Sequence, residues 1–194
     1  MNRGFWLGVV FMAGIGAGEA RAEWVNISGT LPETDIQTLA AHPTQPDRLY
    51  AVAGKNLYFS RDAGAQWKRV LSVRGGNELH FIYPDPKNVS IVYVATSHGA
   101  RKSADAGKSW KTVYQGVGNE AKIVHWIGAL PQEGWLWLGT GKGLVRLSED
   151  GKNVSKVATF PDVSVYSMQA SPEGGWFAAT SQGIYKSVDQ GEHS

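Results

Sequence analysis

The feature that most constrains this chain of 194 residues is an internal repeat. The pattern S-x-D-x-G-x-x-W occurs as "SRDAGAQW" at 60–67 and as "SADAGKSW" at 103–110. Two further stretches, "LSEDGKNV" and "SVDQGEHS", keep the glycine in register. The four glycines are separated by 43, 44 and 40 residues, and they are Gly64, Gly107, Gly151 and Gly191. A fixed period of this length indicates one supersecondary unit that is copied and stacked, because a single copy cannot bury its apolar faces alone.

Each period contains three β-prone segments before its glycine turn. The segments directly before the turn are "NLYFS", "GARKS", "GLVRL" and "GIYKS". They follow the apolar runs "RLYAVAG", "IVYVATS", "WLWLGTG" and "WFAATSQ", and an earlier apolar run ends near Pro43, Pro84, Pro131 or Pro172. Such runs, bounded by Gly, Pro, Asn and Asp, predict strands, and a fourth strand is expected to begin at the aromatic residue that closes the turn. No segment shows a sustained period of 3.6, so we expect essentially no helix.

The residue types of the repeated turn suit a tight hairpin. An aspartate accepts backbone N–H bonds within its own turn, serine does so more weakly, and glycine permits positive φ. The tryptophan starts the outer strand and covers the gap between neighbouring sheets. In the third copy, Leu147, Glu149 and Val154 stand in the places of Ser, Asp and Trp. The predicted structural residues are Ser60, Asp62, Gly64, Trp67, Ser103, Asp105, Gly107, Trp110, Glu149, Gly151, Ser187, Asp189 and Gly191.

This turn pattern resembles the Asp-box, or BNR repeat. The resemblance rests on the two complete copies, at 60–67 and 103–110, and covers nearly all of the chain after residue 22. Asp-box repeats occur on the β-propellers of sialidases, other glycoside hydrolases, sortilin-type receptors, and photosystem II assembly factors with their bacterial relatives. The resemblance implies an all-β propeller of four-stranded antiparallel blades. Because these families share the turn and differ in activity, it also implies a structural role for the repeated aspartates.

Four strands in about 40–45 residues have the dimensions of a propeller blade. The predicted periods are 24–66, 67–109, 110–153 and 154–194, or about four blades. "WVNI" at 24–27 matches the residues that begin at Trp67 and at Trp110, so the chain opens with a fourth strand that has no turn before it. Two alternatives follow: Trp24 closes a small four-bladed ring where Ser194 leaves a gap, or the chain is part of a seven- or eight-bladed propeller.

Residues 1–22 are predicted to be a signal peptide. Arg3 precedes an apolar run and then "ARA" at 20–22, which indicates cleavage before Glu23. The alternative is an N-terminal anchor, but the run is short and rich in glycine. We therefore expect a periplasmic or secreted protein with no stable membrane span after cleavage. Losing Arg3, Arg21 and Glu19 changes the net charge from +2 to +1, and without basic clusters the chain is not expected to bind nucleic acid.

Motifs for catalysis or cofactor binding do not emerge from the sequence. The chain has no cysteine, and its five histidines lack the spacing of a zinc site, so no metal and no cofactor are predicted. The arginine triad and Tyr/Glu pair that the sialidase resemblance would require are not recognisable. Glu78, Glu120 and Asp162 are candidate acids for glycoside hydrolysis, but solvated loop residues explain them better. Whether the chain is an enzyme stays open, and a non-catalytic role is favoured.

The hairpins between the second and third strands of the blades carry the candidate binding residues. Lys55, His98, Lys142 and Gln182 occupy equivalent positions there, and Arg74 lies on a loop expected to reach the same face. A polar, mildly cationic ring at the propeller axis suits an acidic protein segment or an anionic glycan; the alternative is ordinary polar turn residues.

The function predicted from these features is an exported, non-catalytic propeller that acts as a protein-binding or assembly scaffold, as the resemblance to photosystem II assembly factors implies. The alternatives are a partial sialidase-like glycoside hydrolase whose catalytic blades are missing and a receptor-like propeller that binds peptides. Self-association through exposed blade faces is also predicted.

Overall fold

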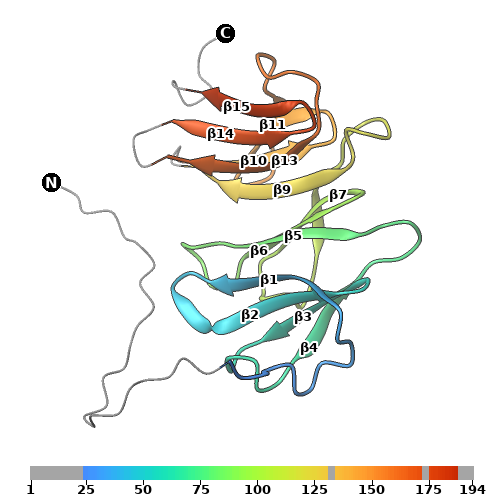
Figure 1. The fold of residues 1–194 in the computed structure, drawn as a ribbon, viewed down its shortest axis with the longest axis vertical. Helices are drawn as coiled ribbons and strands as arrows, with labels where there is room; N and C mark the ends of the chain where they lie inside the picture. The colour runs from blue at the N-terminus through green and yellow to red at the C-terminus, as the bar shows by residue number, and fades with distance from the viewer. Residues whose placement is uncertain (1–23, 131–133, 172–174, 188–194) are drawn as a thin grey trace, which may run out of the picture.

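The computed structural model describes residues 24–130, 134–171 and 175–187, and it contains four antiparallel sheets that stack in chain order (Figure 1). The regular elements of these residues are all strands, so the all-β prediction is confirmed. No helix in the described part is long and apolar enough to cross a membrane. The predicted signal peptide, its cleavage before Glu23, and the turn residues Asp189 and Gly191 lie outside the described residues.

Each sheet is a meander of consecutive strands. The first contains β1 (Ile36–His42), β2 (Gln45–Ala53), β3 (Asn56–Ser60) and β4 (Lys68–Ser72). The second contains β5 (Leu79–Pro84), β6 (Val92–Thr96), β7 (Gly99–Ser103) and β8 (Lys111–Tyr114). The third contains β9 (Val124–Ala129), β10 (Trp135–Thr140), β11 (Gly143–Ser148) and β12 (Val154–Lys156). The fourth contains β13 (Val165–Ala170), β14 (Trp176–Thr180) and β15 (Gly183–Ser187) within the described residues.

The strands coincide with the β-prone segments of the repeat. The third strands β3, β7 and β15 match the predicted pentapeptides residue for residue, and the outer strands β4 and β8 begin one residue after the tryptophan of the turn. Each of the first three sheets therefore takes its outer strand from the sequence period that follows it. The second strands of the two middle sheets, β6 and β10, are nearly continuous apolar runs because both of their faces are covered by neighbouring sheets.

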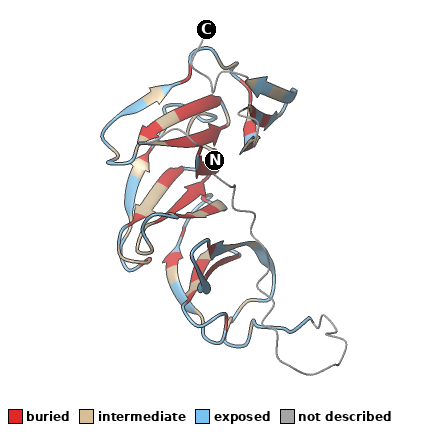
Figure 2. Ribbon diagram, turned by 90° about the vertical axis from the view of Figure 1, so that its left-hand side faces the viewer, coloured by how far each residue is buried: buried red, intermediate tan, exposed pale blue. Residues whose placement is uncertain are grey.

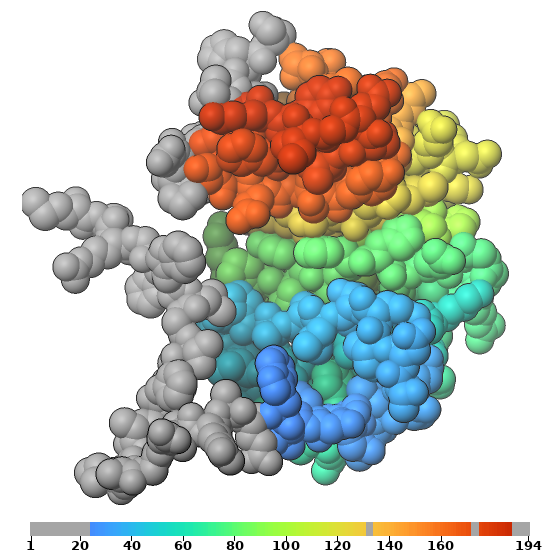
Figure 3. Space-filling view, viewed as in Figure 1, coloured from blue at the N-terminus to red at the C-terminus, as the bar shows by residue number. Residues whose placement is uncertain are grey.

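Burial between the sheets produces the core. The first strands of successive sheets are neighbours, since β1 contacts β5, β5 contacts β9, and β9 contacts β13. They therefore form the inner edge of the stack. Three apolar clusters fill the spaces between the first and second, second and third, and third and fourth sheets. Figure 2 shows the buried residues on the sheets, and Figure 3 shows the sheets packed in sequence from one end of the molecule to the other.

The turns after β3 and β7 have nearly the same hydrogen bonds. The Ser60 hydroxyl donates to Asp62 Oδ1 (2.7 Å) and accepts from the Gly64 N–H (2.9 Å), while Asp62 also accepts from the Gln66 N–H. Ser103 and Asp105 repeat this arrangement, with distances of 2.7–2.8 Å. Gly64 and Gly107 have φ of 92° and 91°, a region that favours glycine. The aspartates are thus turn acceptors at the end of β3 and β7 opposite the β2–β3 and β6–β7 hairpins.

The third turn differs from the sequence prediction. Glu149 does not act as the turn acceptor; its carboxylate lies 3.3 Å from Lys87 Nζ. The acceptor is Asp150, which takes a hydrogen bond from the Ser148 hydroxyl (2.5 Å) and one from the Lys152 N–H (3.0 Å). Aligning the glycines puts Leu147 and Glu149 in the places of the serine and the acid. In the structure these roles belong to the next residues, Ser148 and Asp150, because the Leu147 side chain is buried in the core, where it is 1% exposed.

Ring closure by Trp24, one of the two alternatives predicted from the sequence, is not seen among the described residues. The Trp24 side chain is 100% exposed, and the first and fourth sheets lie at opposite ends of the stack (Figure 1). The sequence match between residues 24–27 and the start of the outer strands nevertheless corresponds to a similarity in the structure. The Trp67 indole donates to the Ile27 carbonyl (3.1 Å), just as the Trp110 indole donates to the Val70 carbonyl (2.9 Å). The segment after Trp24 thus contacts the first sheet much as β4 contacts the second.

Candidate functional site

The hairpins between the second and third strands lie at the same end of each blade, on one side of the stack that we call the turn face (residues 54–55, 97–98, 141–142 and 181–182). In three of them a threonine organises the turn: Thr96, Thr140 and Thr180 accept from the N–H two residues later and donate to the glycine carbonyl three residues later. The predicted residues Lys55, His98, Lys142 and Gln182 occupy these hairpins. All four therefore lie at equivalent places in successive blades.

Loops between the sheets divide these residues into two groups. Lys55 Nζ donates to the Gly75 carbonyl (2.8 Å) and Ser97 Oγ donates to the Gly76 carbonyl (3.3 Å), so the loop that carries Arg74 bridges the first two hairpins. Ser164 bridges the other two hairpins, through Gly141 and Ser181. The structure thus brings Lys55, Arg74 and His98 into one neighbourhood and Lys142 and Gln182 into another.

The positive charge expected on the turn face is partly neutralised. Lys142 Nζ lies 3.9 Å from Asp162, and Asp162 also pairs with Lys156. The hydrogen bond from Lys156 lowers the pKa of Asp162, and the charges of both lysines act in the same direction. Two lysines share one carboxylate here, so the second group of hairpin residues keeps a small excess of positive charge.

A row of side chains along the inner strands lies next to the turn face. The pairing register of every inner strand shifts at one residue near its start: Gln37 in β1, His80 in β5, His125 in β9 and Tyr166 in β13. A β-bulge redirects the side chain of the extra residue. We call these four residues the axial row, since the inner strands line the axis side of the blades.

Three members of the axial row contact one another. The rings of His80 and His125 are stacked with centroids 5.5 Å apart, and the ring of Tyr166 meets His125 edge-on at 5.1 Å. His80 Nδ1 lies 2.8 Å from the Val124 carbonyl, and its Nε2 lies 3.7 Å from Glu78. Burial lowers the pKa of His125, and the charge of His80 lowers it further. The row therefore presents flat rings with polar edges, and Tyr166 is half exposed.

Sequence reasoning missed this row because it treated the histidines as scattered. His80 and His125 are both the second residue of an inner strand, as are Gln37 and Tyr166. That shared position was available from the repeat. The bulge that turns the side chains toward one another was not, because it is a property of the pairing between strands.

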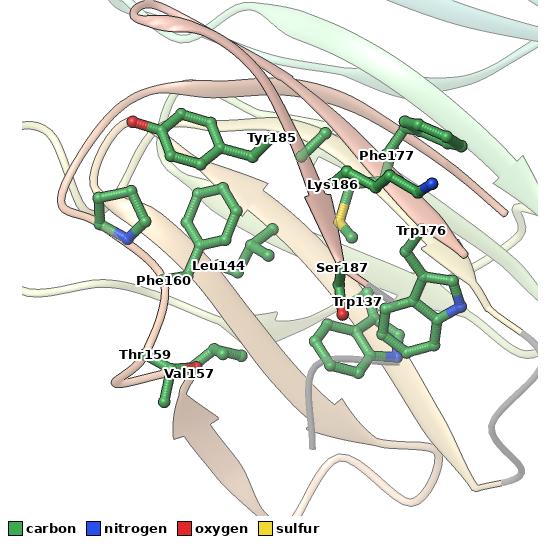
Figure 4. A pocket seen from close by; sticks show the side chains of 13 residues that line it. Trp137, Leu144, Val157, Thr159, Phe160, Trp176, Phe177, Tyr185, Lys186 and Ser187 are labelled. Atoms are coloured by element: carbon green, nitrogen blue, oxygen red, sulfur yellow. The ribbon is translucent and has the colours of Figure 1, made fainter. Parts of the chain in front are cut away.

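A hollow of about 350 Å³ lies between the third and fourth sheets (Figure 4). Trp137 and Trp176 meet edge-on at one side of it, with centroids 4.7 Å apart, and Phe160 and Tyr185 lie at the other. Trp137 Nε1 is buried without a hydrogen-bond partner in the described part of the chain. This hollow is mostly apolar and belongs to the packing between two blades.

A second hollow, of about 610 Å³, separates the turns after β3 and β7. Its cationic lining residues are Arg61, Lys68, Arg69 and Lys108. In the described residues, none of these four forms an ion pair with a carboxylate within 4.0 Å. The Asp62 carboxylate also lines this hollow, so four cations and one acid gather at the end of the blades opposite the turn face.

Two of the three candidate acids, Glu78 and Asp162, have basic side chains as partners. Glu78 pairs with His80, and Asp162 is held by two lysines. Glycoside hydrolysis requires one carboxyl group with a raised pKa as general acid, whereas the pKa of Asp162 is lowered. Among the described residues, no group of three or more His, Asp or Glu side chains is arranged to hold a metal ion.

Solved structures with the same fold belong to several functional classes. A GH74 enzyme from Niastella koreensis matches with a TM-score of 0.60 and 18% identity, over 79% of this chain and 28% of the enzyme. The extracellular domain of the two component system BT4673 from B. thetaiotaomicron matches with a TM-score of 0.65 and 21% identity, over 79% of this chain and 20% of that one. YCF48 bound to D1 peptide matches with a TM-score of 0.56 and 18% identity, over 78% of this chain and 49% of YCF48.

These matches support the β-propeller architecture. The chain spans half or less of the length of each of the three proteins, so it corresponds to a part of their propellers. No family model matches the chain, and no curated protein sequence matches it significantly.

Proposed function

We propose that this protein is an exported, non-catalytic Asp-box propeller that binds an extended segment of a partner protein along its axial row. The observation that carries the proposal is the contact of His80, His125 and Tyr166, which come from three successive blades and form one strip of rings. A strip that crosses blade boundaries suits an elongated ligand. Ring faces offer apolar and stacking contacts, and the imidazole and phenol edges offer hydrogen bonds to a peptide backbone.

The fold comparison supports a peptide ligand. YCF48, which has the same blade architecture, is bound to a D1 peptide in its solved structure. The loop around Arg74 and the hairpins at Lys55 and His98 adjoin the start of β5, from which His80 projects. We propose that these residues contact the acidic part of the partner segment, while Lys142 and Gln182 contribute polar contacts at the other end.

Export is supported by the leader-like pattern in residues 1–22. The extracellular BT4673 and BT3049 domains, which share the fold, are consistent with a periplasmic or secreted location. The Asp-box assignment is supported by the matching hydrogen bonds of Ser60–Asp62 and Ser103–Asp105.

The second candidate is a part of a glycoside hydrolase, which the GH74 matches favour. Asp162 argues against catalysis by this chain, because its lysine partners lower its pKa, whereas a general acid needs a raised pKa. The purified protein is expected to release no reducing sugar from xyloglucan. Release that is lost in a Glu78→Gln or Asp162→Asn variant would favour the enzyme instead.

The binding proposal is tested with a displayed library of random peptides, selected on the purified protein. Affinities of the selected peptides are then measured by calorimetry for the wild type and for His125→Ala and Tyr166→Ala. Loss of a ring contact in the row is expected to weaken binding at least tenfold, while Gln169→Ala, on the same strand as Tyr166, serves as the control. Equal affinities in all four proteins, with unchanged circular dichroism, would exclude the axial row. Charge reversal at Lys55 and Lys142 then separates a contribution of the turn face from that of the row.

A further inference from the structure

Every contact between successive blades joins two different faces. The front face of a blade presents an aromatic residue from its second strand and a residue from the start of its third strand. The back face of the next blade presents two apolar residues from its inner strand. The front pairs are Tyr50 and Leu57, Tyr93 and Ala100, Trp137 and Leu144, and Phe177 and Ile184. The back pairs are Ile36 and Leu39, Leu79 and Ile82, Val124 and Ile127, and Val165 and Met168.

The front face of the fourth blade is uncovered. The aromatic residues Tyr50, Tyr93 and Trp137 of the first three blades are each 1% exposed, because the next blade lies on them. At the equivalent places in the fourth blade, Phe177 is 38% exposed and Ile184 is 79% exposed. A lysine also lies over the aromatic ring in both the second and the fourth blade. Lys186 Nζ is 5.6 Å from the centre of the Phe177 ring, and Lys102 Nζ is 5.2 Å from the centre of the Tyr93 ring. The fourth blade thus keeps the features of an inter-blade contact without a blade on it.

The back face of the first blade is uncovered at its inner strand. The back pairs of the other three blades are between 0% and 8% exposed, whereas Ile36 is 38% exposed and Leu39 is 59% exposed. The two ends of the stack therefore present the two complementary halves of a contact that occurs three times inside the chain.

The N-terminal segment adds a third complementary feature. A Cβ placed on Gly64 would lie 2.8 Å from Ile27, as one on Gly107 would lie 2.9 Å from Val70 of β4. Ile27 therefore occupies the place of an outer-strand residue of a preceding blade. Trp24 and Val25, at 100% and 69% exposure, extend from it into solvent. In the described residues, the fourth blade lacks such an outer strand, and β15 has β14 as its strand neighbour.

We propose that two copies of this chain associate head to tail, with the front face of the fourth blade of one copy on the back face of the first blade of the other. The segment from Trp24 to Ile27 of one copy then lies beside β15 of its partner. Two copies of four sheets give eight blades, which is within the range of closed propellers. Because each copy has one front and one back end, a ring of two copies uses both ends of each and leaves neither uncovered.

A head-to-tail arrangement fits the charges better than a contact between two front faces. Lys186 accompanies the uncovered Phe177 ring, so two front faces would bring two lysines together. This inference does not depend on the proposed peptide-binding function, because His80, His125 and Tyr166 are not among the residues of the front and back faces that meet.

The test is the molar mass of the purified protein by size-exclusion chromatography with light scattering, over a range of protein concentrations. The wild type is expected to have twice the mass of one chain. Ile184→Glu and Leu39→Glu, both at exposed positions, are each expected to give monomers with unchanged circular dichroism. Val117→Glu, at a loop position that is 94% exposed, is the matched control and is expected to remain dimeric.

Mixing the two monomeric variants distinguishes the arrangement. The Leu39→Glu chain keeps an intact front face and the Ile184→Glu chain keeps an intact back face, so the mixture is expected to form a heterodimer through one interface. A monomeric wild type at every concentration would overturn the proposal. A Leu39→Glu variant that remains dimeric while Ile184→Glu is monomeric would replace it with a contact between two front faces.

Discussion

At the scale of single residues, the repeated turn shows how a short motif acts locally. Ser103 and Asp105 satisfy several backbone N–H groups within one turn, and the Ser109 hydroxyl adds a further bond to Asp105 (2.6 Å). Hydrogen bonds from the Ser109 side chain and backbone, followed by the one from Ser103, lower the pKa of Asp105 to about 2. Asp62 shows the same direction of shift, mainly because of its bond from the Gln66 N–H. The local bonds need the ionised carboxylate.

Asp105→Asn is expected to lower the melting temperature at neutral pH and to make the protein less sensitive to acid. The pKa of the folded state is below the ordinary value of 3.8, so the ionised carboxylate stabilises the fold above that pH and loses this effect as the pH falls toward 2. Scanning calorimetry between pH 7 and pH 2 measures both effects. Asp35→Asn, just before β1, makes the same change in charge as a control; identical pH profiles for the two variants would show that the turn does not need its carboxylate.

At the scale of elements, glycine is the first residue of three of the four third strands, β7, β11 and β15, and two of these glycines separate the effect of backbone conformation from that of packing. Gly99 of β7 and Gly183 of β15 have φ of 110° and 108°. A Cβ on Gly99 would lie 2.1 Å from the Tyr114 carbonyl oxygen of β8, whereas one on Gly183 would meet nothing within 4 Å in the described part of the structure. The pairing of β7 with β8 therefore requires glycine for a steric reason that the β15 edge lacks.

Gly99→Ala is expected to destabilise the protein more than Gly183→Ala. Both substitutions place alanine at positive φ, at a cost of about 1–3 kcal/mol, but only the first also forces β8 away from β7, for about 1–3 kcal/mol more. Urea unfolding of the two variants gives the difference in the free energy of unfolding. Equal losses of unfolding free energy in the two variants would mean that β8 moves away from residue 99 without destabilising the protein.

At the scale of the whole molecule, stability depends on contacts between sheets. The cluster between the second and third sheets contains Ile127 and Leu138, both 0% exposed, together with residues of both blades. Among the described strands, the main contacts of each blade are with its sequence neighbours, as expected of a stacked repeat. The interface in the middle of the stack is therefore the main connection between the two halves of the described part.

Ile127→Ala is expected to lower the free energy of unfolding by about 2–5 kcal/mol, because the side chain is buried in a closely packed interface. Val117→Ala, in an exposed loop of the same region, is expected to change it by less than about 0.5 kcal/mol. Urea titrations followed by tryptophan fluorescence measure both variants. A loss at Ile127 as small as that at Val117 would indicate that the two halves unfold independently of this interface.

The amino-acid sequence alone determined the repeat, the strand positions and the turn chemistry, because these depend on local propensity and on spacing along one chain. It also placed Lys55, His98, Lys142 and Gln182 on equivalent hairpins, since a repeat puts equivalent residues at equivalent places. Only the tertiary structure decided that Asp150 replaces Glu149, because burial of Leu147 sets the register of that turn. It also decided that His80, His125 and Tyr166 meet and that the two end faces stay uncovered while Trp24 extends into solvent. These features depend on bulges and on stacking between blades, which join residues more than 40 positions apart.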